Sequence, residues 1–177
     1  IEAEKYIRKS IEIYPEQPIA LTNLGSILSD LGQEQESIIC FKKAIKLKPN
    51  LVAAYYNLAV LLRDTNKAKE SKEIVIKALE IDQSFYKGYF LLGVLSKEAT
   101  KYDEAKKYLE KAIKLNTKDD KIYEELCSVL LSLNKHKEAR ILYEKSINSF
   151  PKNNYLKIGL LNTLSSTCDW ESLSKNK

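Results

Sequence analysis

The side chains that could carry covalent or metal chemistry are few in this sequence and lie far apart. There is one histidine, His136, and there are three cysteines, Cys40, Cys127 and Cys168. His136 has no Ser or Cys partner at helical spacing, which a nucleophile and its base would need. Three widely separated thiols fit neither a disulfide framework nor a zinc site. We therefore expect no catalytic residue, no metal and no cofactor in this chain.

Composition and charge narrow the class of protein further. Hydrophobic residues make up 44% and charged residues 30% of the chain, as in a water-soluble fold with a buried core. No apolar run approaches the roughly 18 residues that span a bilayer. The net charge of +5 comes from lysines interleaved with acids along the whole chain, whereas nucleic-acid binders concentrate their charge. We expect a soluble protein of a reducing, cytoplasmic compartment that binds neither nucleic acid nor membrane.

An internal repeat of 34 residues organises the chain. A small residue recurs at Ala3, Ser37, Ser71, Ala105 and Ala139, and a bulky one four positions later at Ile7, Phe41, Val75, Leu109 and Tyr143. Two further series are Ser10, Ala44, Ala78, Ala112 and Ser146, and Leu24, Leu58, Leu92, Leu126 and Leu160. A residue must be small where two helices cross closely, and its bulky neighbour fills the adjacent space.

Each period holds two amphipathic helices. Apolar positions are three and four residues apart, which predicts helices over 18–31 and 34–47 and, after adding the period, in the later repeats. The turn between the helices falls at Gly32, Asn66, Thr100 and Asn134. Gly and Asn tolerate the left-handed conformation that reverses a chain, so Thr is the unusual member. Adjacent acids at Asp119-Asp120 indicate a solvated helix start, where negative charge is favourable.

This pattern resembles the tetratricopeptide repeat (TPR) in the residues Leu21, Leu24-Gly25, Leu28, Ser37, Phe41, Ala44 and Pro49. The resemblance implies an all-α fold, a right-handed superhelix of antiparallel helix pairs. Complete repeats are expected at 18–51, 52–85, 86–119 and 120–153. Residues 1–17 are expected to be the second helix of a truncated repeat. Residues 154–177 are expected to be a first helix and a junction to a missing downstream region.

The same resemblance places the function in a concave groove lined by the first helix of each repeat. The candidate peptide-binding residues are Asn23, Ser26, Asp30, Tyr56, Asn57, Arg63, Asp64, Lys87 and Phe90, and the implied lining also includes Thr22, Leu91 and Val94. The amides of Asn23 and Asn57 can hold the backbone of an extended peptide, because each offers donors and an acceptor. The alternative is that both are ordinary solvated residues.

A different use of this fold, a Lys and Asn clamp for the C-terminal carboxylate of a chaperone tail, is matched only in part. Asn57 and Lys87 occupy two of its positions. Thr22, Ser26 and Leu91 stand where further donors are usual, and a carboxylate needs those charge-assisted bonds. We therefore expect Lys87 to be an ordinary solvated lysine.

The repeat pattern ends at Cys168-Asp169-Trp170. This junction resembles the one that precedes the catalytic region in the O-linked N-acetylglucosamine transferase (SPINDLY-like) family. The Asn-Leu-Gly at 23–25 and the Asn-Leu-Ala at 57–59 also look like that family's repeats, whose Asn ladder binds substrate peptides. The ladder is interrupted here by Leu91, Glu125 and Gly159. Alternatively, Trp170 is a packed aromatic residue that caps the end of the solenoid.

These observations predict a protein–protein interaction module that binds an extended peptide or partner segment. The resemblance implies that the module is the repeat region of a larger glycosyltransferase-like protein, although this chain itself is expected not to be an enzyme. The alternative is a free-standing adaptor scaffold or self-association domain with no catalytic partner.

Overall fold

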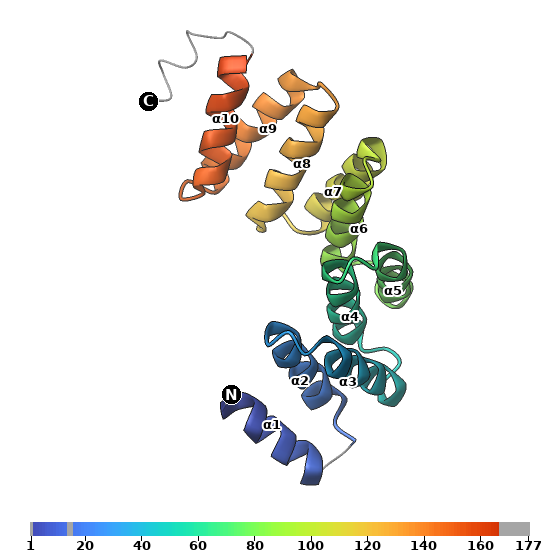
Figure 1. Cartoon of the computed structure of the whole chain (residues 1–177). Coiled ribbons are helices and arrows are strands. Elements are labelled where there is room, and N and C mark those ends of the chain that lie inside the picture. The colour runs from blue at the N-terminus through green and yellow to red at the C-terminus, as the bar shows by residue number, and fades with distance from the viewer. Residues whose placement is uncertain (1, 14–15, 167–177) are drawn as a thin grey trace. The chain divides into compact units, whose positions relative to one another are not determined.

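The computed structural model describes residues 2–13 and 16–166, and the regular elements in these ranges are α-helices (Figure 1). They are α1 (Glu2–Ile13), α2 (Pro18–Asp30), α3 (Glu34–Leu47), α4 (Val52–Asp64), α5 (Ala68–Ile81), α6 (Tyr86–Glu98), α7 (Tyr102–Leu115), α8 (Asp120–Ser132), α9 (His136–Ser149) and α10 (Asn154–Ser166). The junction residues Cys168, Asp169 and Trp170 lie outside the described residues.

The helices follow the period of the sequence. The first helix of each pair begins at Pro18, Val52, Tyr86, Asp120 or Asn154, at intervals of 34 residues. The predicted helices 18–31 and 34–47 are confirmed to within one residue, since α2 ends at Asp30 and α3 at Leu47. A short turn reverses the chain inside each pair, so the fold is an all-α stack of antiparallel helix pairs.

A residue in the left-handed conformation forms the tip of each turn. The φ angle is 73° at Gly32, 60° at Asn66, 57° at Thr100 and 56° at Asn134. The N–H groups of Gly32 and Gln33 donate to the carbonyls of Ser29 and Leu28, which closes the end of α2. Thr100 adopts the same conformation, although it is rare for a β-branched residue and costs backbone strain. The prediction of a turn at all four positions is confirmed.

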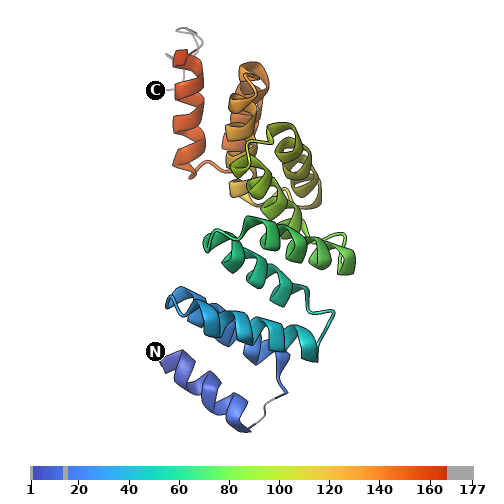
Figure 2. The same cartoon turned by 45° about the vertical axis from the view of Figure 1, so that its right-hand side comes forward.

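The helices divide into two compact units, Ile1–Gly88 and Tyr89–Lys177, and α6 contributes to both. In the first unit α1 packs on α2, α2 on α3, α3 on α4 and α4 on α5 (Figures 1 and 2). One hydrophobic cluster consists of Phe41, Leu58, Leu61 and Leu62, and another of Leu24, Leu28 and Cys40. Each pair buries its apolar stripe against the next pair, so neighbouring repeats stabilise one another.

Small buried residues let the two helices of a pair approach closely. Ser37 and Ser71, equivalent members of one series, are fully buried. The distance from Oγ to the facing carbonyl oxygen is 2.6 Å both from Ser37 to Gly25 and from Ser71 to Ala59. A Cβ added at Gly25 would lie 2.7 Å from Cε1 of Phe41, so only glycine leaves room for this ring. The predicted close crossing of the helices is confirmed.

An ion pair joins α1 to α3 one repeat further along. Arg8 Nη1 and Nη2 donate to Oε1 and Oε2 of Glu36 at 2.6 and 3.0 Å. Two parallel bonds of this kind match the planar guanidinium to the planar carboxylate. The hydrogen bond from Arg8 holds the pKa of the Glu36 carboxyl below its ordinary value.

In the second unit α7 packs on α8, α8 on α9 and α9 on α10. The small residues Ala105, Ala112 and Ala139 are fully buried, as their series predicts. A Cβ added at Gly93 would lie 2.6 Å from Cγ of Leu109, so this repeat combines a glycine with a leucine where the first combines a glycine with a phenylalanine.

Candidate functional site

The polar sides of α2 and α4 carry most of the residues that the sequence assigns to a peptide groove. The apolar stripes of these helices are buried, with Leu24 and Leu28 on α2 and Leu58 and Leu62 on α4. The candidates Asn23, Ser26 and Asp30 lie on α2, and Tyr56, Asn57, Arg63 and Asp64 lie on α4. The two helices contact each other, so polar groups of consecutive repeats meet.

A chain of hydrogen bonds runs from α4 to α2. Asn57 Nδ2 donates to Ser26 Oγ at 3.0 Å, and Ser26 Oγ donates to the carbonyl of Thr22 at 3.1 Å. Thr22 Oγ1 in turn donates to the carbonyl of Pro18 at 2.8 Å. These bonds fix the orientation of the Asn57 amide and leave its Oδ1 to accept from another molecule. Thr22 itself is buried, which corrects its predicted place on the groove lining.

The side chain of Asn23 is exposed, and within the described part of the chain it makes no hydrogen bond to protein. Its amide therefore keeps two donors and one acceptor for a ligand or for water. Asn57 bonds to Ser26 and not to Asn23. The two amides are thus separate groups on successive repeats, one held in position and one open.

The other candidates of the first unit are partly engaged with neighbours. The rings of Tyr56 and Phe85 meet edge to face with their centroids 5.4 Å apart. Arg63 Nη2 and Nε donate to Oδ1 of Asp64 at 2.7 and 3.0 Å, so this cation and anion largely neutralise each other. Exposed pairs of this kind contribute little to stability. Asp30 and Lys87 are exposed.

The second unit carries different groups at the positions of these amides. Leu91 and Val94 are buried, which corrects their implied place on the groove lining, and Phe90 is half-buried. Glu125 is equivalent to Asn57 two repeats later, and its Oε2 accepts from Lys97 Nζ at 2.6 Å. An ion pair between consecutive repeats therefore replaces the amide in this unit.

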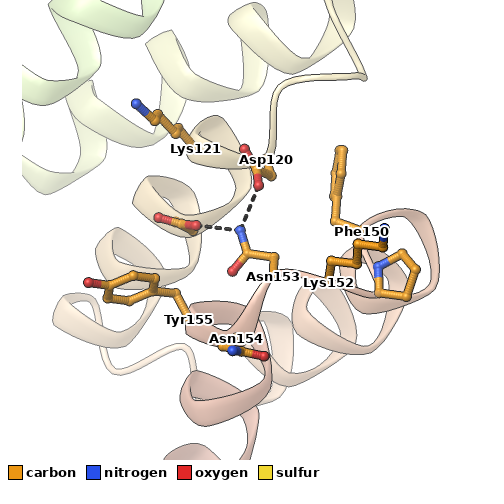
Figure 3. A pocket seen from close by; sticks show the side chains of 9 residues that line it. Asp120, Lys121, Phe150, Lys152, Asn153, Asn154 and Tyr155 are labelled. Atoms are coloured by element: carbon orange, nitrogen blue, oxygen red, sulfur yellow. Dashed lines mark hydrogen bonds between the residues drawn. The ribbon is translucent and has the colours of Figure 1, made fainter.

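A pocket of about 700 Å³ lies between the start of α8 and the loop that leads into α10 (Figure 3). Asn153 lies inside it, and its Nδ2 donates to Asp120 Oδ2 at 2.8 Å and to Glu124 Oε1 at 2.5 Å. Its Oδ1 accepts from the N–H of Leu156 at 3.1 Å, so Asn153 also caps α10. Asn153 is not among the site residues predicted from the repeat pattern. Its signal is an Asn directly before a predicted helix, a preferred N-cap type.

The Cys127 thiol and the Tyr143 phenol, both in the second unit, are unsuited to nucleophilic chemistry. Cys127 is fully buried, and burial raises the pKa of its thiol to about 12, with a smaller contribution from Glu124. Burial likewise raises the pKa of Tyr143 to about 12. A thiol must ionise to act as a nucleophile, so Cys127 is a packed residue.

The remaining residues with possible chemistry also have structural surroundings. His136 is half-exposed, and its Nδ1 is buried without a hydrogen-bond partner among the described residues. Asp119 caps α8, its Oδ1 accepting from the N–H of Lys121 at 3.2 Å, which confirms the predicted helix start. The described residues contain no cluster of His, Cys, Asp and Glu that could hold a metal ion. None of their helices is long and apolar enough to cross a membrane.

Both the sequence and the fold resemble those of known proteins. Three tetratricopeptide repeat family models match residues 19–51, 40–73 and 97–161. A search of curated proteins finds no match. Among solved structures, YrrB, described as a TPR protein with an unusual peptide-binding site, is 20% identical with a TM-score of 0.73, over 96% of this chain and 88% of its own.

Two further structures share the fold. PilF of Pseudomonas aeruginosa is 18% identical with a TM-score of 0.83, over 96% of this chain and 78% of its own. MamA is 23% identical with a TM-score of 0.76, over 90% of this chain and 87% of its own. At these identities the likeness shows the fold alone, a TPR solenoid. Neither the family models nor these structures point to a glycosyltransferase, so the implied relation to the O-linked N-acetylglucosamine transferases has no support from them. Repeat period, helix pairing and family matches agree, and the chain belongs to the tetratricopeptide repeat family.

Proposed function

We propose that this chain is a protein-interaction scaffold, and that the polar side of α2 and α4 holds an extended segment of a partner protein. The observation that carries the proposal is the pair of amides on consecutive repeats. Asn57 is held in position by its bond to Ser26, and Asn23 is exposed with its amide open.

The two amides suit a peptide backbone better than a particular side chain. A carboxamide offers a donor and an acceptor, which match the N–H and C=O of an extended chain whatever its sequence. The bond from Asn57 to Ser26 fixes one amide before a ligand arrives, which lowers the entropy lost on binding. The description of YrrB as a TPR protein with a peptide-binding site supports this use of the fold.

The scaffold does not require a catalytic partner in the same protein. We favour an adaptor over the repeat region of a glycosyltransferase, because none of the three structural neighbours is described as a transferase. The junction that most specifically suggested the transferase, Cys168 to Trp170, lies outside the described part of the chain.

Peptide selection tests the proposal. A random nonapeptide library displayed on phage is selected on the immobilised chain, and the affinity of a selected synthetic peptide is measured by isothermal titration calorimetry. Each of Asn23→Ala and Asn57→Ala is expected to weaken binding by about tenfold, the loss of roughly one or two hydrogen bonds. Ser26→Ala is expected to weaken it less, since the Asn57 amide loses only its support.

The control is Asn148→Ala, which removes an exposed amide from α9. This variant is expected to bind as the unchanged chain does. Equal affinity of the Asn23 and Asn57 variants and the unchanged chain would show that the amides hold no peptide. A chain that selects no peptide and sediments as a concentration-dependent dimer would instead favour self-association.

A further inference from the structure

The pocket at the start of α8 gathers two negative charges around a neutral group. Asp120 and Glu124 lie four residues apart on one helix, and both accept hydrogen bonds from the same nitrogen, Asn153 Nδ2 (Figure 3). Like charges at this spacing destabilise a helix. The positive end of the helix dipole offsets part of this cost for Asp120, which lies in the first turn. The amide satisfies hydrogen bonds but supplies no positive charge.

The position of both carboxylates is fixed by the fold. Asn153 uses its Oδ1 to cap α10 and both protons of its Nδ2 on the two acids. Each carboxylate still has an oxygen that does not bond to Asn153. The pocket therefore presents two anionic acceptors whose orientation is already set. Little further side-chain entropy is lost when a donor binds to them.

The walls of the pocket add an aromatic face. Tyr155, the second residue of α10, is 78% exposed and lines the pocket together with Phe150 and Pro151. An exposed phenol ring at this position can stack against a flat cation. Tyr155 extends from α10 and Asp120 from α8 (Figure 3), and both line the pocket together with Glu124.

Two lysines, Lys121 and Lys152, also line the pocket, but within the described residues neither is paired with the acids Asp120 and Glu124. Figure 3 shows the ammonium group of Lys121 directed away from the Asn153 amide. Each carboxylate thus keeps an oxygen that can accept from a cation of another molecule.

We propose that this pocket binds the guanidinium group of an arginine in a partner protein. Its N–H groups donate to Asp120 and Glu124, and its plane lies against the ring of Tyr155. A guanidinium offers five donors in a planar fork and stacks on aromatic rings, whereas an ammonium is a compact point charge. This site recognises a side chain and consists of residues of the second unit alone. It is therefore distinct from the amides of the first unit, which are proposed to bind a peptide backbone.

An NMR titration with short probe peptides tests the site. Acetyl-Gly-Leu-Arg-Leu-Gly-amide is added to the ¹⁵N-labelled chain, and the Asn153 side-chain resonances are followed. A second peptide carries citrulline, which has the shape of arginine but no charge, and a third carries lysine. The arginine peptide is expected to shift the Asn153 resonances and to bind at least about tenfold more tightly than the citrulline peptide, because its bonds to the acids are charge-assisted.

Charge-neutral variants locate the binding. Asp120→Asn with Glu124→Gln keeps acceptors for Asn153 and is expected to weaken the arginine peptide by at least about tenfold. The control Asp103→Asn with Glu110→Gln makes the same change of net charge on exposed acids of α7. This control is expected to keep the affinity. Circular dichroism verifies the fold of each variant. If the double variant does not fold, the affinity is measured with the single variant Glu124→Gln instead.

Several outcomes would overturn the site. Equal affinity of the arginine and citrulline peptides would show that charge is not recognised, and equal affinity of the lysine peptide would remove the guanidinium specificity. An equal loss of affinity in the α7 control variant would show that the peptide responds only to the net charge of the chain. Loss of pentapeptide binding in an Asn23→Ala, Asn57→Ala variant would place the peptide in the first unit. Unchanged binding in that variant would show that the arginine pocket works without the amides of the first unit, so either proposal can fail while the other stands.

Discussion

The packing of Gly93 against Leu109 gives a quantitative test of how the repeat accommodates side chains. A Cβ added at Gly93 would lie 2.6 Å from Cγ and 2.8 Å from Cδ2 of Leu109, distances that unstrained atoms do not adopt. The equivalent residues of the second repeat are Ala59 and Val75, both fully buried. We infer that packing constrains the combined side-chain volume at these two positions and not the residue type at each one.

The expected magnitudes follow from two opposing effects. An extra methyl group in a filled core costs about 1–3 kcal/mol, and alanine in a helix interior is about 1 kcal/mol more favourable than glycine. Gly93→Ala should therefore lower the free energy of unfolding by up to about 2 kcal/mol. Leu109→Val alone should lower it by about 1 kcal/mol through lost burial. The double variant restores the combination found at Ala59 and Val75, so it should lose no more than about 1 kcal/mol.

Urea unfolding followed by far-UV circular dichroism measures all three variants against the unchanged chain. The reverse exchange, Ala59→Gly with Val75→Leu, is the matched control and should show coupling of the same sign. Independent effects of the two substitutions, which add without coupling, would refute the idea of a shared volume. A rise in stability on Gly93→Ala would refute the steric reading of the contact.

Two further predictions concern the turns and the buried ionisable groups. Thr100→Asn should raise the free energy of unfolding by about 1 kcal/mol, because Asn tolerates a φ of 57° better than Thr does. Asn66→Thr should lower it by a similar amount. Urea unfolding measures both variants, and an unchanged stability in both would contradict the backbone strain inferred at Thr100. The pKa values of Cys127 and Tyr143, about 12 in the folded chain, exceed those of the unfolded chain, about 8.5 and about 10. The unfolded chain then loses its protons first, so stability should fall as the pH rises from about 9 towards 12. Urea midpoints measured against pH for Tyr143→Phe and Cys127→Ala should show a flatter fall, and an unchanged slope would contradict the assignment.

Much of the fold is predictable from the sequence because the period is uninterrupted. An assignment made for 18–47 transfers to every later repeat, and the helices begin where the period places them. Small residues such as Ser37 and Ala105 indicate the close crossings, and glycine or asparagine indicates the turns. These signals are local, so they survive without knowledge of the neighbouring helices.

The candidate site is less predictable, because it depends on how far each helix is rotated in the stack. Thr22, Leu91 and Val94 lie at the edge of the apolar stripe, and helical periodicity alone does not decide on which side of that edge they fall. All three are buried in the structure. The hydrophobic periodicity identifies the buried face of a helix. Helix packing determines whether the residues at the edge of that face are buried or exposed.

The repeat, the ten described helices and their turns follow from residue spacing and backbone preference, so they are encoded locally in the chain. Which side chains meet depends instead on how the helices pack. The bond between Asn57 and Ser26 joins residues 31 apart, and that between Asn153 and Asp120 joins residues 33 apart. Such contacts depend on the positions of two helices at once and on the rotamers that both allow, which one-dimensional spacing does not specify.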